Sequence, residues 1–185
     1  MQLILWNDAE AEAKDEAVSD FVRTFTPKGN CQAAKMAAWF KAQPGIDLKR
    51  WKILVSPARR VQQTTAALDT TSGIQFETLA SIALEATSDA ILRAVKWPDS
   101  ATNIIAVGHQ PTLGLVIAKL LNGHDEPIAA GGVSVLKEAM PCFEARWFET
   151  RTMTKDKNYQ TILRAVATWD TVTGKASRTY PATLA

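Results

Sequence analysis

The chain has 185 residues, 46% of them hydrophobic, which is enough for one well-buried core and too few for two ordinary domains. Its 21 basic and 19 acidic side chains leave a net charge of +2, which excludes the strongly basic field of a nucleic-acid binder. The sequence has no apolar run of about 18 residues that could span a bilayer and no signal-peptide pattern, so we expect a cytoplasmic protein without a membrane partner. Cys31 and Cys142 form no C-x-x-C pair, so we expect neither a disulfide framework nor a structural zinc.

Apolar runs alternate with helical patterns over the first two thirds of the chain. The runs at 2–6, 52–56, 75–79 and 103–108 are predicted as strands. Thr26 and Pro27 begin a predicted helix that ends before Pro44, and further helices are predicted over 57–68, 88–96 and 111–121. Such alternation is typical of βαβ units, so we predict an α/β fold with a mainly parallel sheet.

The remaining third has a different pattern. Strand-like runs at 133–136, 143–150 and 159–167, with a polar connection over 151–158, predict antiparallel strands at an edge of the sheet. Residues 170–185 are small, polar and aperiodic, and we expect them to be a loosely held tail. The predicted organisation is therefore a single domain over 1–169 followed by this tail.

Polar side chains follow three of the predicted strands. Ligands of open α/β sheets bind beyond the carboxyl ends of the strands, so these side chains are candidate binding groups. They are Asn7, Asp8 and Glu10 after the first strand, Arg59 and Arg60 after the second, and His109 after the fourth. Arginine and histidine beside helix N-termini favour an anion, and phosphate is the natural candidate.

The stretches VSPARRVQQT (55–64) and VGHQPTLG (107–114), preceded by TPKG (26–29), resemble the motifs of the histidine phosphatase superfamily. The resemblance covers roughly residues 2–167 and is strongest to the small bacterial phosphohistidine phosphatases. It implies a phosphoglycerate mutase-like, three-layer α/β/α sandwich. It also implies that Arg60 clamps the phosphoryl group and that His109 is the second histidine, which steadies the phosphoryl oxygens. Glu85 is the nearest candidate for the family's proton donor.

The first motif departs from the family pattern. The family has Arg-His-Gly/Ala-Glu after its first strand, and Ala9 and Glu10 match the last two positions. Asn7 then stands in place of the arginine and Asp8 in place of the nucleophilic histidine. A slip of one residue would place Asn7 at the histidine position, but neither register supplies an imidazole. Asp8 could instead pair with His109, which would favour the charged imidazole.

This departure changes the predicted activity. A missing transition-state donor typically costs about 100- to 1000-fold in rate, and here a clamp and the nucleophile are both absent. We therefore predict an inactive or strongly impaired phosphohistidine phosphatase-like protein that binds phosphate, a phosphoprotein or a phosphorylated small molecule, with Asn7, Glu10, Arg60 and His109 as binding residues.

The alternative is an active phosphatase in which Asp8, Glu10 or His109 has an altered role. No cofactor is expected, and a metal ion held by Asp8, Glu10 and His109 is the less favoured interpretation. The sequence does not define the oligomeric state.

Overall fold

The computed structural model describes residues 1–68, 74–122, 145–152, 159–169 and 176–177. They form one mixed sheet in the order β3-β2-β4-β1-β5-β6-β7. Its parallel part comprises β1 (Gln2–Asn7), β2 (Lys52–Val55), β3 (Phe76–Thr78) and β4 (Ile104–Gly108). The strands β5 (Ala145–Thr152), β6 (Tyr159–Trp169) and β7 (Ala176–Ser177) continue the sheet in antiparallel pairing. The mainly parallel sheet with antiparallel strands at one edge is confirmed.

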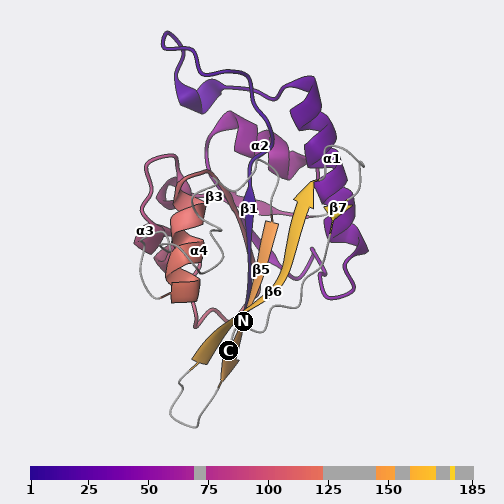
Figure 1. Ribbon diagram of the computed structural model, residues 1–185, viewed down its shortest axis with the longest axis vertical. Helices are drawn as coiled ribbons and strands as arrows, with labels where there is room; N and C mark the ends of the chain where they lie inside the picture. Colours follow the sequence, from indigo (N-terminus) through magenta and orange to yellow (C-terminus); the bar gives the residue numbers. More distant parts are fainter. Residues whose placement is uncertain (69–73, 123–144, 153–158, 170–175, 178–185) are drawn as a thin grey trace, which may run out of the picture.

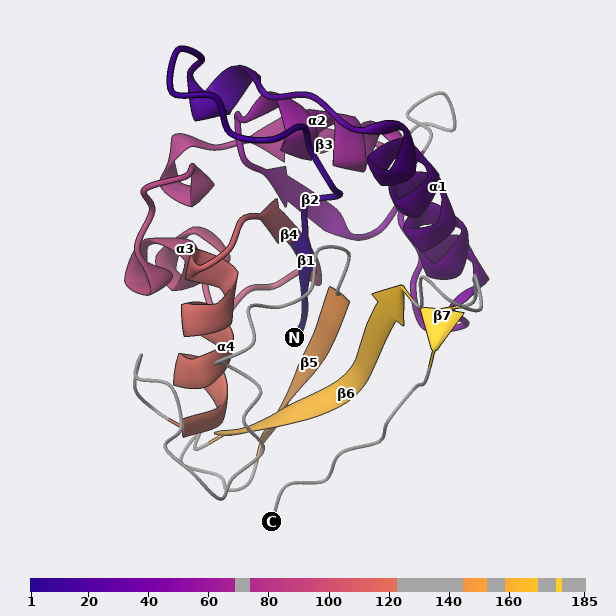
Figure 2. The ribbon, with the colours of Figure 1, turned by 45° about the horizontal axis from the view of Figure 1, so that its top comes forward.

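Helices cover both faces of this sheet, as Figures 1 and 2 show. On one side lie α1 (Pro27–Ala42) and α2 (Arg59–Ala66), and on the other α3 (Ser88–Ala94) and α4 (Thr112–Asn122). Two short 3-10 helices, η1 (Asp20–Val22) and η3 (Ala80–Ile82), belong to the connections. The three-layer α/β/α architecture is therefore confirmed.

Alternation along β1 explains why both faces are covered. Ile4 and Trp6 belong to the core cluster beneath α1 and α2, whereas Leu3 and Leu5 belong to the cluster beneath α3 and α4. Each of these four side chains is almost completely buried. Since successive side chains of a strand point to opposite faces, a continuous apolar run is what a strand in the middle layer requires.

The start of α1 agrees with the sequence prediction. Thr26 is the N-cap, its side-chain oxygen accepts a hydrogen bond from the backbone N–H of Gly29, and Pro27 occupies the first turn. A Cβ atom on Gly29 would lie 1.9 Å from the carbonyl oxygen of Glu10. Only glycine permits this approach, so the backbone after β1 and the first turn of α1 are fixed against each other.

The predicted antiparallel region is described only in part. The runs at 143–150 and 159–167 correspond to β5 and β6, while the run at 133–136 and most of the connection lie outside the described residues. Ala176 and Ser177, in the predicted tail, pair with Trp169 and Thr168 of β6. This part of the tail is therefore a strand of the sheet, because its backbone satisfies the free edge of β6. The rest of the tail lies outside the described residues.

Within the part of the chain that the structure describes, no helix has both the length and the apolar character needed to cross a bilayer.

Candidate functional site: an ion cluster at the carboxyl end of the sheet

Asp8 leaves the sheet beside the end of β4. Asn7 is paired with Gly108 in the parallel register, and the backbone N–H of Asp8 donates to the carbonyl oxygen of Gly108 at 3.1 Å. The next N–H, of Ala9, donates to Oγ1 of Thr64 on α2 at 3.0 Å. Two bonds to two different elements therefore hold the backbone on either side of the Asp8 side chain.

The carboxylate of Asp8 forms a buried ion pair with Arg60. Arg60 is the second residue of α2, and its residue surface is 5% exposed. Its Nε donates a hydrogen bond to Oδ2 of Asp8. Because charges are rarely buried unless they are paired, this contact accounts for both side chains lying inside the protein.

The remaining face of the Arg60 guanidinium is bound by Asp20, which lies in η1. Arg60 Nη1 donates to the backbone carbonyl oxygen of Asp20 at 2.7 Å, and Nη2 donates to Asp20 Oδ2 at 3.0 Å. The other carboxylate oxygen of Asp20 accepts a hydrogen bond from Nε of Arg23. Partial burial opposes ionisation of Asp20, but the charges and hydrogen bonds of Arg60 and Arg23 outweigh it and lower the pKa of this carboxyl.

His109 completes the cluster from the end of β4. Its Nδ1 lies 3.0 Å from Arg60 Nη2 and 3.5 Å from Asp8 Oδ2, and its Nε2 lies 2.6 Å from Ser56 Oγ. A guanidinium can only donate, so Nδ1 accepts from Arg60 and the ring proton is on Nε2, where it is donated to Ser56. This arrangement holds a neutral imidazole, and the charged His109 paired with Asp8 that the sequence suggested is not the state that these bonds favour.

Ser56, His109 and Asp8 lie in the order of a serine hydrolase triad, but the geometry is wrong for that chemistry. The Ser56 residue is fully buried, and its Oγ also lies within 3.3 Å of the backbone N–H of Ala58 as an acceptor. His109 Nδ1 is closer to Arg60 than to Asp8. A triad needs an accessible nucleophile and a carboxylate on the second ring nitrogen. Ser56 therefore orients His109.

The charges of the cluster balance. Arg60 and Arg23 carry two positive charges and Asp8 and Asp20 carry two negative ones, and His109 is neutral in this bonding pattern. Four N–H groups of Arg60 have acceptors, on Asp8, on both groups of Asp20 and on His109. The groups that would bind an anion are thus already bound to parts of the chain itself.

Asn7 has a different environment from its neighbour. It is 2% exposed, and its Oδ1 has no hydrogen-bond partner among the described residues. By alternation along β1 it faces the same side as Leu3 and Leu5, toward α3 and α4. Asn7 thus places a short neutral amide at this nearly fully buried position, where the resemblance implies an arginine.

Glu10, the remaining predicted phosphate-binding residue after β1, is directed away from the cluster. Its carboxylate accepts hydrogen bonds from Thr26 Oγ1 at 2.9 Å and from Lys28 Nζ at 2.7 Å. The bond from Lys28, followed by that from Thr26, lowers the pKa of Glu10. The free N–H groups at the start of α1 also favour a carboxylate there, which explains this orientation.

The metal site considered from the sequence would need Glu10 beside Asp8 and His109, but the Glu10 carboxylate is directed to Thr26 and Lys28. The described residues contain no group of three His, Cys, Asp or Glu side chains that could hold a metal ion.

Glu85 is exposed and lies in the connection between η3 and α3. It lines a shallow hollow with Phe21 and Ala86, and no hydrogen bond or ion pair joins it to the described residues of the cluster. Arg59, the other arginine among the candidate binding groups, is exposed. The structure thus brings Asp8, Arg60 and His109 together and leaves Glu85 at the surface.

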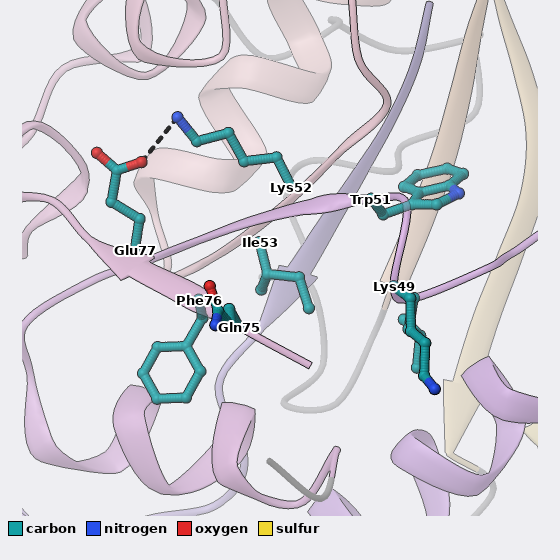
Figure 3. Close-up of a pocket in the computed structure, with 8 residues that line it drawn as sticks. Lys49, Trp51, Lys52, Ile53, Gln75, Phe76 and Glu77 are labelled. Carbon is teal, nitrogen blue, oxygen red and sulfur yellow. Dashed lines mark ion pairs between the residues drawn. The ribbon is translucent and has the colours of Figure 1, made fainter. Parts of the chain in front are cut away.

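A hollow of about 350 Å³ lies at the opposite end of the parallel strands, beside the first residues of β2 and β3 (Figure 3). Lys52 and Glu77 form an ion pair of 2.7 Å there. Trp51 and Phe76 contribute aromatic rings to its wall. None of the side chains predicted to bind phosphate lines this hollow, so the cluster at the carboxyl end remains the candidate site.

Three residues of the cluster were missed by the sequence reasoning in these roles: Asp20, Arg23 and Ser56. Asp20 and Arg23 lie in a polar segment without periodicity, and the contact from Asp20 to Arg60 spans 40 residues. The available signal was local: Ser19 caps the short helix, and the spacing of Asp20 and Arg23 allows an ion pair across one turn. That pairing alone does not reveal the long-range partner.

Comparisons with known proteins agree with this fold. No protein-family model matches the chain. The phosphohistidine phosphatase SixA of Escherichia coli (strain K12) is 27% identical over 135 residues, which cover 69% of this chain and 79% of the relative. The SixA structure from Agrobacterium tumefaciens superposes with a TM-score of 0.68 at 19% identity, covering 90% of this chain and 97% of that one. The structure of the protein histidine phosphatase SixA complexed with tungstate gives 0.62 at 20% identity, covering 90% and 96%.

The fold is therefore that of the phosphoglycerate mutase-like proteins. Together with the sequence similarity to SixA, this fold supports the resemblance of the chain to the histidine phosphatase superfamily.

Proposed function

We propose that this protein binds a phosphoryl group between Arg60 and His109 and hydrolyses it slowly or not at all. The observation that carries the proposal is the position of Asp8, whose carboxylate contacts Arg60 and lies 3.5 Å from His109 Nδ1. By the resemblance, those two side chains hold the transferred phosphoryl group and a histidine stands where Asp8 is. The proposed phosphate-binding side chains are thus retained, while the imidazole that would attack phosphorus is replaced.

The replacement has a clear electrostatic consequence. An imidazole attacks phosphorus as a neutral nitrogen, whereas an ionised Asp8 adds a negative charge facing the phosphoryl oxygens. Two like charges about 4 Å apart cost on the order of 4 kcal/mol at an effective dielectric constant of 20. Enzymes that phosphorylate an aspartate offset such repulsion with a metal ion and further cations. In this cluster Arg60 is already shared between Asp8 and Asp20.

The proposed ligands are phosphate, a protein that carries phosphohistidine, or a small phosphorylated molecule. The likeness to SixA supports the phosphohistidine class, because that relative is a phosphohistidine phosphatase. We further propose that the protein acts in the cytoplasm as a single domain over 1–169, with 170–185 as an appended segment. A binding or regulatory role fits these features better than turnover.

The decisive experiment is a repair of the first motif. Asp8→His restores the imidazole, and Asn7→Arg with Asp8→His restores both residues of the family pattern. Both variants are needed, because position 7 is nearly fully buried and a longer arginine must find room there. Dephosphorylation of a phosphohistidine-carrying protein and of a generic aryl phosphate is measured for each. We expect the original protein to be inactive and a repaired variant to gain turnover.

Two controls separate the proposal from its alternative. Asn7→Arg with Asp8→Ala adds the same positive charge without an imidazole, and it should remain inactive. If instead the unmodified protein turns over phosphohistidine and Asp8→Ala abolishes that turnover, Asp8 is a reacting group and the proposal is wrong. The same assay with and without divalent metal ions tests a metal-assisted mechanism.

A further inference from the structure

The segment that follows β1 runs over the carboxyl end of the sheet before it reaches α1. Figures 1 and 2 show it as the indigo connection that carries η1 beside α2. Backbone contacts close the segment on itself at its base, where Ala11 forms an isolated bridge with Phe25 and Glu12 N donates to Thr24 O. Its outer part, with η1, is the part that touches Arg60.

The outer part has little apolar attachment to the rest of the protein. Val18, Phe21 and Val22 are 42%, 40% and 50% exposed. Because apolar stabilisation scales with the area removed from water, side chains this exposed contribute only a fraction of their possible stabilisation. The polar contacts of Asp20 with Arg60 are therefore a main attachment of this segment to α2.

We propose that Asp20 is a built-in competitor for the phosphoryl site, so that an incoming phosphate displaces its carboxylate from Arg60 and releases the segment that carries η1. This inference rests on the proposed phosphoryl binding at Arg60. Its basis is that Asp20 occupies both terminal nitrogens of the guanidinium, Nη1 through its backbone carbonyl oxygen and Nη2 through its carboxylate. These are the two nitrogens that would hold a phosphate in a bidentate contact.

Asp20 is a better candidate for displacement than Asp8. The Asp8 side chain is 12% exposed and its backbone is fixed by Gly108, whereas the Asp20 side chain is 24% exposed and lies on a surface segment. Arg23 stays bound to Asp20 when Arg60 is released, so the displaced carboxylate keeps a partner of opposite charge. A phosphate that takes the place of Asp20 also lies next to His109, which contacts Arg60 Nη2.

Calorimetric titration with tungstate and with inorganic phosphate tests the competition. Asp20→Asn keeps the size of the side chain and removes its charge, and we expect about tenfold tighter tungstate binding, because a competing anion is lost. Glu16→Gln is the matched control, since it removes an exposed carboxylate from the same segment and should leave the affinity unchanged. Equal or weaker binding by Asp20→Asn would overturn the inference and would mark Asp20 as a support of Arg60.

Limited trypsin digestion provides a second readout that does not depend on affinity. Lys14 and Arg23 are cleavage sites within the segment. We expect saturating tungstate to accelerate cleavage there in the unmodified protein, and Asp20→Asn to be cleaved fast without tungstate. Unchanged protection in the tungstate-bound protein would contradict the release. If neither protein binds an oxyanion, both the inference and the proposed phosphoryl site are wrong. If both proteins bind and Asp20→Asn changes neither the affinity nor the cleavage, only the inference is wrong.

Discussion

Asp8 and Glu10 are two carboxylates that leave the same strand two residues apart, and they have opposite environments. The Asp8 side chain is 12% exposed and paired with an Arg60 side chain that is 6% exposed, whereas the side chains of Glu10 and Lys28 are 32% and 57% exposed. Asp8 lies within a cluster joining α2, η1 and β4. The Glu10 carboxylate instead contacts Thr26 and Lys28 at the start of α1.

The difference shows how burial sets the energetic weight of the same chemical group. A buried ion pair gains little net stability over an apolar replacement, but removing one partner leaves an uncompensated charge out of water. An exposed pair exchanges one set of solvated contacts for another. The Asp8 pair should therefore be sensitive to the loss of one partner, and the Glu10 pair should be tolerant.

The largest expected effect comes from Arg60→Met. This substitution leaves the carboxylates of Asp8 and Asp20 without their shared cation, and we expect a loss of about 3–5 kcal/mol in the free energy of unfolding at neutral pH. Urea unfolding measures it. Arg60→Met with Asp8→Asn is the control, because removing the buried charge as well should recover part of the loss. A cost below about 1 kcal/mol would show that the cluster is solvated and that the Asp8 pair does not differ from the exposed Glu10 pair.

Most of the fold was predictable because its signals are local. The apolar runs at 2–6 and 103–108 match β1 and β4 within one residue at each end, since a covered strand leaves a continuous hydrophobic pattern. Thr26 and Pro27 predicted the start of α1 because capping depends on neighbours in sequence. The tail was predicted less well, because the pairing of β7 with β6 is set by a free sheet edge and by no pattern within residues 176–177.

The site was predictable only where it follows strand ends. Asp8 and His109 directly follow β1 and β4, and Arg60 lies in the first turn of α2, so their meeting follows from the order of parallel strands. Asp20 reaches Arg60 from a connection whose course the sequence does not define. Glu10 carries the same carboxylate group as Asp8 at nearly the same position in the sequence, and only the geometry of α1 directs it to Thr26 and Lys28.

An intermediate effect is expected for Thr26→Ala, which tests the exposed Glu10 region. The substitution removes the N-cap bond to Gly29 N and the hydrogen bond to Glu10. We expect a cost of about 1 kcal/mol in the free energy of unfolding, typical of a lost cap, measured by thermal and urea unfolding. Thr26→Ser keeps the hydroxyl and serves as the control. A cost as large as that of Arg60→Met would mean that the two regions do not differ.

The smallest effect is expected for Lys28→Gln. Lys28 is the main cause of the lowered pKa of Glu10, so its removal should return that pKa toward its ordinary value of 4.5, followed by NMR titration of the carboxyl group. Because the folded-state pKa is lowered, the stabilisation is complete above the unfolded-state value and is lost as the pH falls through the folded-state value. At neutral pH we expect a loss of less than about 1 kcal/mol, shrinking further in concentrated salt. Lys28→Arg keeps the charge and should retain both the pKa and the stability. A loss that persists in high salt would place the Glu10 pair in the same class as the buried Asp8 pair.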